Sequence, residues 1–451
     1  MTDHSARWRI WGALAGNVFA RGIRAVEQFL LIPILLTVWG TEQYGEWIVL
    51  ISIAAFATIA NLGIGQAALS DIVLCYANGD KQQAARAFAT AIILITMVVI
   101  VGFLLLVVAV HVLDVGAFVT LHSITPQEAR SVIEIAGLAA LLAFYIEPFI
   151  GVIGSAIGAA MPNVLFAIAK IFELIGVVIA LRLSAGPTGV AVVMLAAAVL
   201  NLAMNAAVAM RVAPWIRIRP SDFDVGLLTR AWKASLGFFV LWLCVNLVSV
   251  HVSRLMVFQF FGASALAAFT VIATYTRAAR MVPTMLSQAT QVEIGRAFGE
   301  RQYEQFRNLF EAVMAAAAIV ALVLLVVELL IAPIVIPLLT RGQFGVDWHL
   351  LIMLALIALV GAYFDAVLVA AAALNRMARI AAFYAAALAV GFVVAILLKG
   401  SLGLWAIGVG LLLPELAGVW SAIRTVRRSM PEPAIRAFPQ PARISQLLRG
   451  R

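Results

Sequence analysis

Four arginines lie within long apolar stretches of this 451-residue chain: Arg21 and Arg24 in the first such stretch, and Arg277 and Arg280 in the eighth. Placing one charged side chain at the centre of a bilayer costs at least about 2.5–3.5 kcal/mol. The planar guanidinium group matches the oxygens of phosphate and carboxylate groups. These arginines therefore indicate a cavity at membrane depth that binds an anion.

Polar residues accompany these arginines at helical spacing. In the first stretch, Asn17, Arg21, Arg24 and Gln28 follow one another at intervals of 4, 3 and 4 residues, which places them on one face of a helix, with Glu27 beside them. The eighth stretch has a longer stripe of the same kind, made by Thr270, Thr274, Arg277, Met281, Thr284, Gln288 and Gln291. Both helices should be apolar on most sides and polar on one.

Two further basic residues, Lys170 and Arg254, are weaker candidates for anion contacts. Lys170 precedes Glu173 by three residues, so these two side chains can also neutralise each other. Arg254 lies near the outer end of its stretch, where a long side chain can reach the headgroup region. Arg24 can pair with Glu27. Local pairing of this kind is an alternative that the spacing leaves open.

By contrast, Arg21, Arg277 and Arg280 have no acidic residue three or four positions away. We expect these three side chains to focus positive potential on a water-accessible cleft of low dielectric.

Three carboxylates within apolar stretches are candidates for coupling to a proton or sodium gradient: Glu27, Glu147 and Asp365. Glu147 precedes Pro148, where the hydrogen-bond ladder of a helix is interrupted. For each carboxylate, pairing with an arginine is an equally good interpretation. No cofactor is expected beyond the ion gradient itself.

The composition excludes a soluble globular protein, because 64% of the residues are hydrophobic and only 12% are charged. The apolar residues form blocks of about 20 or more, which is the length that crosses a bilayer as a helix. We predict an all-α polytopic membrane protein with twelve transmembrane helices. The predicted spans are 11–38, 45–75, 87–110, 130–160, 163–183, 189–212, 231–260, 264–297, 306–338, 348–374, 378–398 and 402–423.

The basic residues predict the orientation of the chain. Of the 31 lysines and arginines, 21 lie at or beyond the ends of the spans on the side of the two termini. Only four fall on the opposite side: Arg130, Arg182, Arg341 and Lys399. By the positive-inside rule, both termini are cytoplasmic. The net charge of +9 is therefore mostly a topology signal, and we expect no nucleic-acid partner.

The spans group into two six-helix lobes, 1–212 and 231–425, joined by a cytoplasmic linker, 213–230. A basic tail, 426–451, has the proline-rich composition of a disordered segment. A weak internal repeat supports the two lobes. Gly40 and Gly262 are 222 residues apart, and the similar tetrapeptides that begin at Gly79 and Gly299 are 220 apart. Lobes repeated in the same orientation are common in transporters with alternating access.

No catalytic constellation is visible. The five histidines and two cysteines have no metal-ligand spacing, and no glycine-rich loop of the ATP-binding type is present. The largest predicted outer loop, 111–129, is short for a membrane-embedded glycosyltransferase or polymerase, which remains an alternative function.

The first part of the chain resembles a known family. The resemblance rests on Arg21-Gly22, Leu31-Ile32-Pro33, Gly40, Tyr44-Gly45-Glu46-Trp47, Asn61-Leu62-Gly63-Ile64-Gly65 and Asn78-Gly79-Asp80. These residues resemble the polysaccharide-transporter, O-antigen flippase (Wzx-type) branch of the MOP exporter superfamily. The chain departs from that pattern at Asn61, where the family usually has aspartate.

The resemblance implies a MATE-like fold and a flippase of the bacterial inner membrane, a secondary transporter and not an enzyme. It would move an undecaprenyl-pyrophosphate-linked oligosaccharide across the bilayer for cell-surface polysaccharide biosynthesis, by ion-coupled alternating access. A polysaccharide polymerase and other assembly proteins would be its partners. Arg21, Arg24, Arg277 and Arg280 would contact the pyrophosphate or acidic sugars.

Two functions of the same fold remain as alternatives. A MATE-like drug/cation antiporter should have a cavity dominated by carboxylates, whereas the two best stripes here are cationic. A lipid II flippase typically has two further spans.

Overall fold

The structure is a computed structural model that describes residues 3–61, 63–112, 120–158, 160–216, 223–224, 226, 236–299, 301–374 and 376–429. Within the described helices, some side chains are not described, among them those of Asn17, Arg21, Arg24 and Gln28. The chain divides into two compact units, Met1–Leu236 and Gly237–Arg451. The predicted linker and tail lie mostly outside the described residues and stay predictions.

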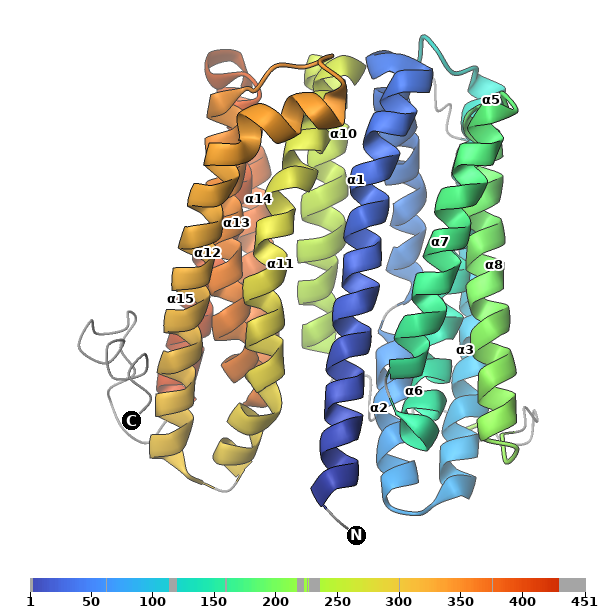
Figure 1. Cartoon of the computed structure of the whole chain (residues 1–451), viewed down its shortest axis with the longest axis vertical. Helices are drawn as coiled ribbons and strands as arrows, with labels where there is room; N and C mark the ends of the chain where they lie inside the picture. Colours follow the sequence, from blue (N-terminus) through green and yellow to red (C-terminus); the bar gives the residue numbers. More distant parts are fainter. Residues whose placement is uncertain are drawn as a thin grey trace. The chain divides into compact units, whose positions relative to one another are not determined.

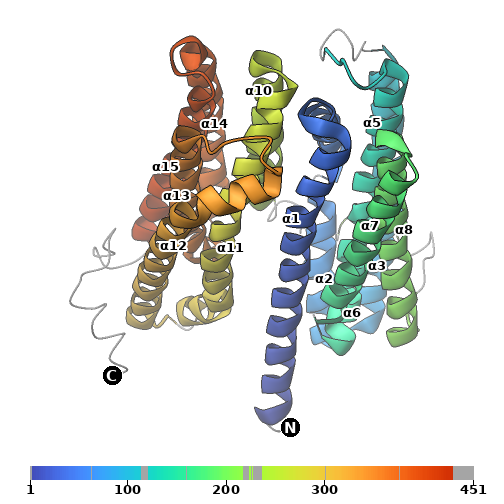
Figure 2. The same cartoon turned by 45° about the horizontal axis from the view of Figure 1, so that its top comes forward.

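The first unit is a bundle of helices (Figure 1). In chain order its elements are α1 (Asp3–Ala55), the 3-10 helix η1 (Phe56–Asn61), α2 (Ile64–Ala77), α3 (Lys81–Val112), α5 (Pro126–Leu142), the 3-10 helix η2 (Ala143–Tyr145), α6 (Ile146–Ile157), α7 (Ala160–Arg182) and α8 (Gly186–Val212). Helices α7 and α8 lie side by side in both views (Figure 1, Figure 2). The helical backbone over 11–38 confirms the predicted first span.

The second unit is also a helical bundle. Its elements are the π-helical stretch η4 (Leu243–Val252), α10 (Ser253–Phe261), α11 (Ala263–Gly299), α12 (Tyr303–Thr340), α13 (Trp348–Ala373), α14 (Met377–Leu402) and α15 (Trp405–Ser429). No strand occurs in the described part of either unit, so the all-α prediction is confirmed.

Glycines with the same unusual backbone separate the first two passes of each unit. Gly40 interrupts α1 with φ 70° and ψ −176°, and Gly262 follows α10 with φ 86° and ψ 178°. This region of φ/ψ space is accessible essentially to glycine alone. The repeat predicted from these two glycines is therefore present in the backbone.

The structure corrects the second half of the predicted repeat. The turn before α3 has Gly79 N–H bonded to Tyr76 O, and its counterpart before α12 has Arg301 N–H bonded to Phe298 O. Both turn residues have positive φ, 80° and 59°. The structural equivalent of Gly79 is thus Arg301, 222 positions later. The similar tetrapeptide at Gly299 is two residues out of register.

Ten helices in the described part of the chain are long and apolar enough to cross a membrane. Helix α11 is not among them, because its arginines and polar stripe lower its hydropathy. It nevertheless packs against α12 and α13 in the bundle, so it is a further pass beside these ten. The chain is a multi-pass membrane protein.

An aromatic core supports the centre of the second unit. Phe364 on α13 stacks on Tyr384 of α14, with ring centroids 5.6 Å apart, and both rings are fully buried. A methyl group at Gly418 on α15 would lie only 2.9 Å from the Phe364 ring, so this glycine lets α15 approach α13 closely. This packing holds Tyr384 in place and supports the positions of Asp365, next to Phe364 on α13, and Glu415, one turn before Gly418 on α15.

Candidate functional site

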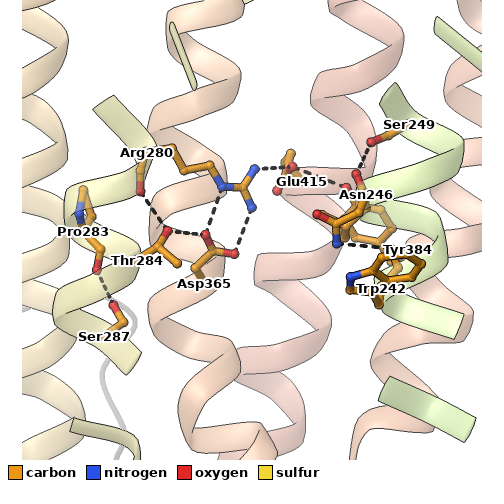
Figure 3. Close-up of polar contacts among 11 residues, drawn as sticks. Trp242, Asn246, Ser249, Arg280, Pro283, Thr284, Ser287, Asp365, Tyr384 and Glu415 are labelled. Atoms are coloured by element: carbon orange, nitrogen blue, oxygen red, sulfur yellow. Dashed lines mark hydrogen bonds and ion pairs between the residues drawn. The ribbon is translucent and has the colours of Figure 1, made fainter. Parts of the chain in front are cut away.

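Arg280 forms the centre of an ion-pair network in the second unit (Figure 3). Its Nε and Nη2 donate to the two carboxylate oxygens of Asp365 at 3.0 and 2.9 Å, a bidentate arrangement. Its Nη1 donates to Glu415 Oε1 at 2.9 Å. The three side chains come from α11, α13 and α15, so the network joins three helices. Charge-assisted bidentate pairs of this kind are among the strongest polar contacts in proteins.

Two hydroxyl groups extend this network. Thr284, one turn after Arg280 on α11, donates to Asp365 Oδ2 at 2.7 Å. The buried Tyr384 hydroxyl donates to Glu415 Oε1 at 3.3 Å. We call Arg280, Thr284, Asp365, Tyr384 and Glu415 the five-residue network. Glu415 Oε2 is buried and accepts no hydrogen bond from the described residues.

The network contains one guanidinium and two carboxylates, so a formal charge of −1 remains when both carboxyl groups are ionised. Binding one proton or one monovalent cation would neutralise it. The side chains of Arg280 and Asp365 are 19% and 20% exposed, so water reaches part of the network.

Arg280 differs from the sequence prediction. The spacing predicts a guanidinium without an acidic partner, but in the structure Arg280 pairs with acids that lie 85 and 135 positions away in the chain. Partners this distant cannot be seen from local helical spacing.

Gly361 makes room for the Arg280 side chain. A Cβ built at this position on α13 would lie 2.2 Å from Arg280 Nη1 and 2.5 Å from its Cζ. Gly361 stands four residues before Asp365, one turn away on the same helix face. The absence of a side chain here allows the guanidinium to lie flat against α13 and reach both carboxylates.

Arg277 has a different environment, although it lies only three residues before Arg280. Its side chain is exposed, and no carboxylate lies within ion-pair distance among the side chains that the structure describes. The charges that act on it are those of Arg254 on α10 and Arg280, both cations. His251 also lies near Arg254 and Arg277. The basic groups thus gathered around Arg277 favour an anion.

Three other polar residues of this region bond to backbone oxygens one turn earlier in the chain. Asn246 donates to Trp242 O at 3.2 Å, and Ser249 donates to Val245 O at 2.6 Å, both within or next to η4. Ser287 on α11 donates to Pro283 O at 2.9 Å (Figure 3). Their bonds are local and explain how polar side chains are tolerated within an apolar bundle.

Lys170 lies between two carboxylates in the first unit. Its Nζ is 2.6 Å from Glu173 Oε2 on the same helix, α7, which confirms the predicted pair. It also lies 3.1 Å from Glu27 Oε1 on α1. Both acids are buried, and Lys170 is 25% exposed. Lys170 is therefore engaged as a link between α1 and α7, which does not favour it as an anion contact.

Glu147 is another carboxylate within the first unit, on α6. Its Oε1 accepts a hydrogen bond from Gln66 Nε2 on α2 at 2.9 Å, while its Oε2 is buried and has no partner among the described atoms. A Cβ at Gly65 would lie 2.0 Å from Oε2, so this glycine leaves space for the carboxylate. The carboxyl group can exchange a proton without breaking an ion pair to a described residue.

Each unit contains a contact between an acid and a polar side chain, with a glycine beside it. In each, an acid on the fourth pass, Glu147 or Asp365, meets a polar side chain on the second pass, Gln66 or Arg280. In each, a glycine on one of the two helices makes room for the charged group, Gly65 in the first unit and Gly361 in the second.

Several predicted residues lie outside what the structure describes. The side chains of Asn17, Arg21, Arg24 and Gln28 are among these, although their backbone is helical. Their role as an anion-binding stripe stays a prediction. Glu27 is described, and its carboxylate contacts Lys170.

Sequence reasoning missed three members of the two sites: Glu415, Tyr384 and Gln66. Glu415 follows Pro414, a signal that marks a helix interruption but does not identify a partner. No group of three or more metal-ligating side chains occurs in the described part of the chain.

The fold is similar to that of MATE transporters of known structure. A MATE transporter in complex with MaL6 superposes with a TM-score of 0.67 at 16% identity, covering 93% of this chain and 95% of the other. A mutant of the Vibrio cholerae MATE transporter VcmN gives 0.68 at 17% identity, covering 95% and 98%. An inward-facing multidrug resistance MATE family transporter of the MOP superfamily gives 0.64 at 18% identity, covering 90% and 98%. Neither a family model nor a curated protein matches the sequence.

Proposed function

We propose that this chain is a secondary transporter that works by ion-coupled alternating access. The fold supports this proposal, because both the inward-facing and the outward-facing conformation of a multidrug resistance MATE family transporter superpose on it. A fold that has been observed in two such conformations can expose a site to either side of a membrane in turn.

The proposed substrate is an anionic lipid-linked glycan, an undecaprenyl-pyrophosphate-linked oligosaccharide carried across the bacterial inner membrane. The observation that carries this choice is Arg277, an exposed guanidinium whose charged neighbours are cations. An uncompensated arginine at membrane depth is costly unless an anion binds there. A pyrophosphate offers the oxygens and the double charge that a guanidinium group binds well.

The five-residue network is the proposed coupling site. It has two carboxylates and one guanidinium, so its formal charge is −1, and it is partly accessible to water. Uptake of a proton or sodium ion at Asp365 or Glu415 would weaken the hold of the carboxylates on Arg280. The freed guanidinium could then add to the positive potential around Arg277. In this way ion binding and anion binding would be linked through one side chain.

A second candidate is a MATE-like drug/cation antiporter, which the structural similarity favours directly. Such an antiporter would use Asp365, Glu415 and Glu147 to bind a cationic compound. The cations around Arg277 argue against this function, because they would repel such a compound.

The experiment that separates the two functions uses the purified full chain in proteoliposomes. One assay follows movement of undecaprenyl-pyrophosphate-linked oligosaccharide by the accessibility of its sugar to an external glycosidase. A parallel assay follows accumulation of the cationic dye ethidium. We expect glycolipid movement by the native chain, and at least a tenfold loss in Arg277→Ala, since a charge-assisted contact contributes about 1.5–3 kcal/mol.

Arg301→Ala is the matched control, because this arginine is exposed on the same unit and lies in the turn before α12. It should keep native activity. Ethidium accumulation without glycolipid movement would reject the flippase and establish the antiporter. Equal glycolipid movement by the native chain and Arg277→Ala would reject the role of Arg277.

A further inference from the structure

Two arginines and two aromatic rings form a continuous cluster at one end of α14 and α15. The Arg379 guanidinium lies 5.8 Å from the Phe383 ring centroid. The Phe383 and Trp420 rings meet edge to face at 5.5 Å. Arg424 lies 4.9 Å from the Trp420 ring centroid. The cluster therefore crosses from one helix to the other and holds two positive charges near its two ends.

The cluster is exposed, and nothing nearby on these helices neutralises it. Both arginines are exposed, and the rings of Phe383 and Trp420 are 38% and 51% exposed. Glu415 is the only acidic residue in α14 and α15, and it is buried and bonded to Arg280. Arg379 also lies in the first turn of α14, where the helix dipole disfavours a cation. An anion that does not belong to these two helices would therefore stabilise Arg379 in this position.

An apolar strip leads away from the cluster along the same two helices. On α14, Phe383, Val390 and Leu397 follow one another at seven-residue intervals and are all exposed, as is Leu416 one turn from Trp420 on α15. Long acyl chains fit such a strip. The basic end lies on the side that the positive-inside rule assigns to the cytoplasm.

We propose that Arg379, Phe383, Trp420 and Arg424 bind the headgroup of an anionic glycerophospholipid from the cytoplasmic leaflet. The phosphate lies between the two guanidinium groups, the rings contact the glycerol region, and the acyl chains follow the apolar strip. Basic sites between helices on the cytoplasmic side are a known means of recognising anionic lipids. This site does not depend on the proposed transport function.

The test is native mass spectrometry of the purified full chain, mixed with equal amounts of phosphatidylglycerol and phosphatidylcholine that carry the same acyl chains. We expect the native chain to retain phosphatidylglycerol in preference to phosphatidylcholine. The double variant Arg379→Gln/Arg424→Gln should lose about 10- to 30-fold of its phosphatidylglycerol affinity, as expected for two arginine contacts with an anionic headgroup.

Arg86→Gln/Arg211→Gln is the matched control. It removes two exposed arginines on the same predicted side of the membrane, from helices α3 and α8. It should retain phosphatidylglycerol within twofold of the native chain. Equal losses in both double variants, or no preference for phosphatidylglycerol in the native chain, would overturn the proposal. If the double variant is not monodisperse, Arg424→Gln alone is measured, and the absence of any loss overturns the proposal equally.

Discussion

Arg277 and Arg280 differ in their surroundings because different side chains from the neighbouring helices face them. Arg280 faces α13 and α15 and is held by two carboxylates, whereas Arg277, three residues earlier, is exposed beside other cations. A partly buried arginine held by acids can serve as a structural or coupling group. An exposed arginine in the same helix remains available to a ligand. Under the proposed function, the pair places an anion contact and a coupling group on one helix, within one turn of each other.

Gly361→Ala should dislodge Arg280 from its carboxylates, because the added methyl group would occupy the place of the guanidinium. Breaking a buried ion pair typically costs about 3–5 kcal/mol. We expect a lower thermal unfolding midpoint of the purified protein and loss of ion-driven transport. Gly400→Ala is the control, since a Cβ at this helical position meets no atom within 4 Å. Equal stability of the two variants would show that Arg280 can be accommodated elsewhere.

Asp365→Asn tests the coupling site. The amide keeps a hydrogen-bond acceptor for Arg280 but can no longer take up a proton or bind a cation by charge. We expect substrate binding within a few-fold of native, and transport that no longer responds to an imposed ion gradient. Glu304→Gln, an acid at the exposed start of α12, should keep the gradient response. A native gradient response in Asp365→Asn would remove this residue from coupling.

At the residue scale, helical spacing was sufficient for pairs within one turn and insufficient for contacts between helices. The Lys170–Glu173 pair follows from an interval of three residues, and the structure confirms it. The partners of Arg280 come from two other helices, so no periodicity within α11 could indicate them. Glycines that make room for charged groups, such as Gly361, leave no local signal either, because their effect depends on the neighbouring helix.

At the scale of elements, the repeat is best seen in the turns and caps between helices. Thr125 and Asp347, 222 residues apart, both cap the helix that follows, and each accepts a hydrogen bond from the backbone N–H three residues on. Gly40 and Gly262 share their backbone conformation at the same interval. The apolar helices themselves carry little of this signal, because many apolar residues fill a lipid-facing position equally well.

Gly40→Ala should lower the stability of the protein, whereas Gly79→Asn should not. Gly40 has φ 70° and ψ −176°, where a side chain costs about 1–3 kcal/mol. Gly79 has φ 80°, but its equivalent Arg301 shows that a residue with a side chain is tolerated in this turn. We expect Gly40→Ala to lower the thermal unfolding midpoint and Gly79→Asn to leave it nearly unchanged. The reverse order would contradict the assignment of the repeat.

At the scale of the whole molecule, composition and hydrophobic blocks were enough to predict an all-α membrane protein. Most element bounds lie within several residues of the predicted spans. Two predicted joints are helical instead: the joint after the first span lies inside α1, where only Gly40 leaves the helical conformation, and the joint before the last span lies in the last turn of α14. The helix whose composition differs most from an apolar block is the one that carries the polar stripe. Helix α11 matches the predicted span 264–297, although it is less apolar than the ten other candidate spans because of the polar stripe that carries Arg277 and Arg280. The least apolar helix is thus the one that the proposed function needs most.

The excess of basic residues on one side predicts which loops face the cytoplasm, and cysteine labelling can test this. In a variant with Cys75→Ser and Cys244→Ala, a cysteine is placed either at Gln343, in the turn after α12, or at Gln82, in the first turn of α3. Both positions are exposed. The positive-inside rule puts Gln343 outside and Gln82 in the cytoplasm. A membrane-impermeant maleimide should therefore label Gln343→Cys in intact cells, and Gln82→Cys only after permeabilisation. The opposite pattern would invert the orientation, and the lipid site at Arg379 and Arg424 would then face the outer leaflet.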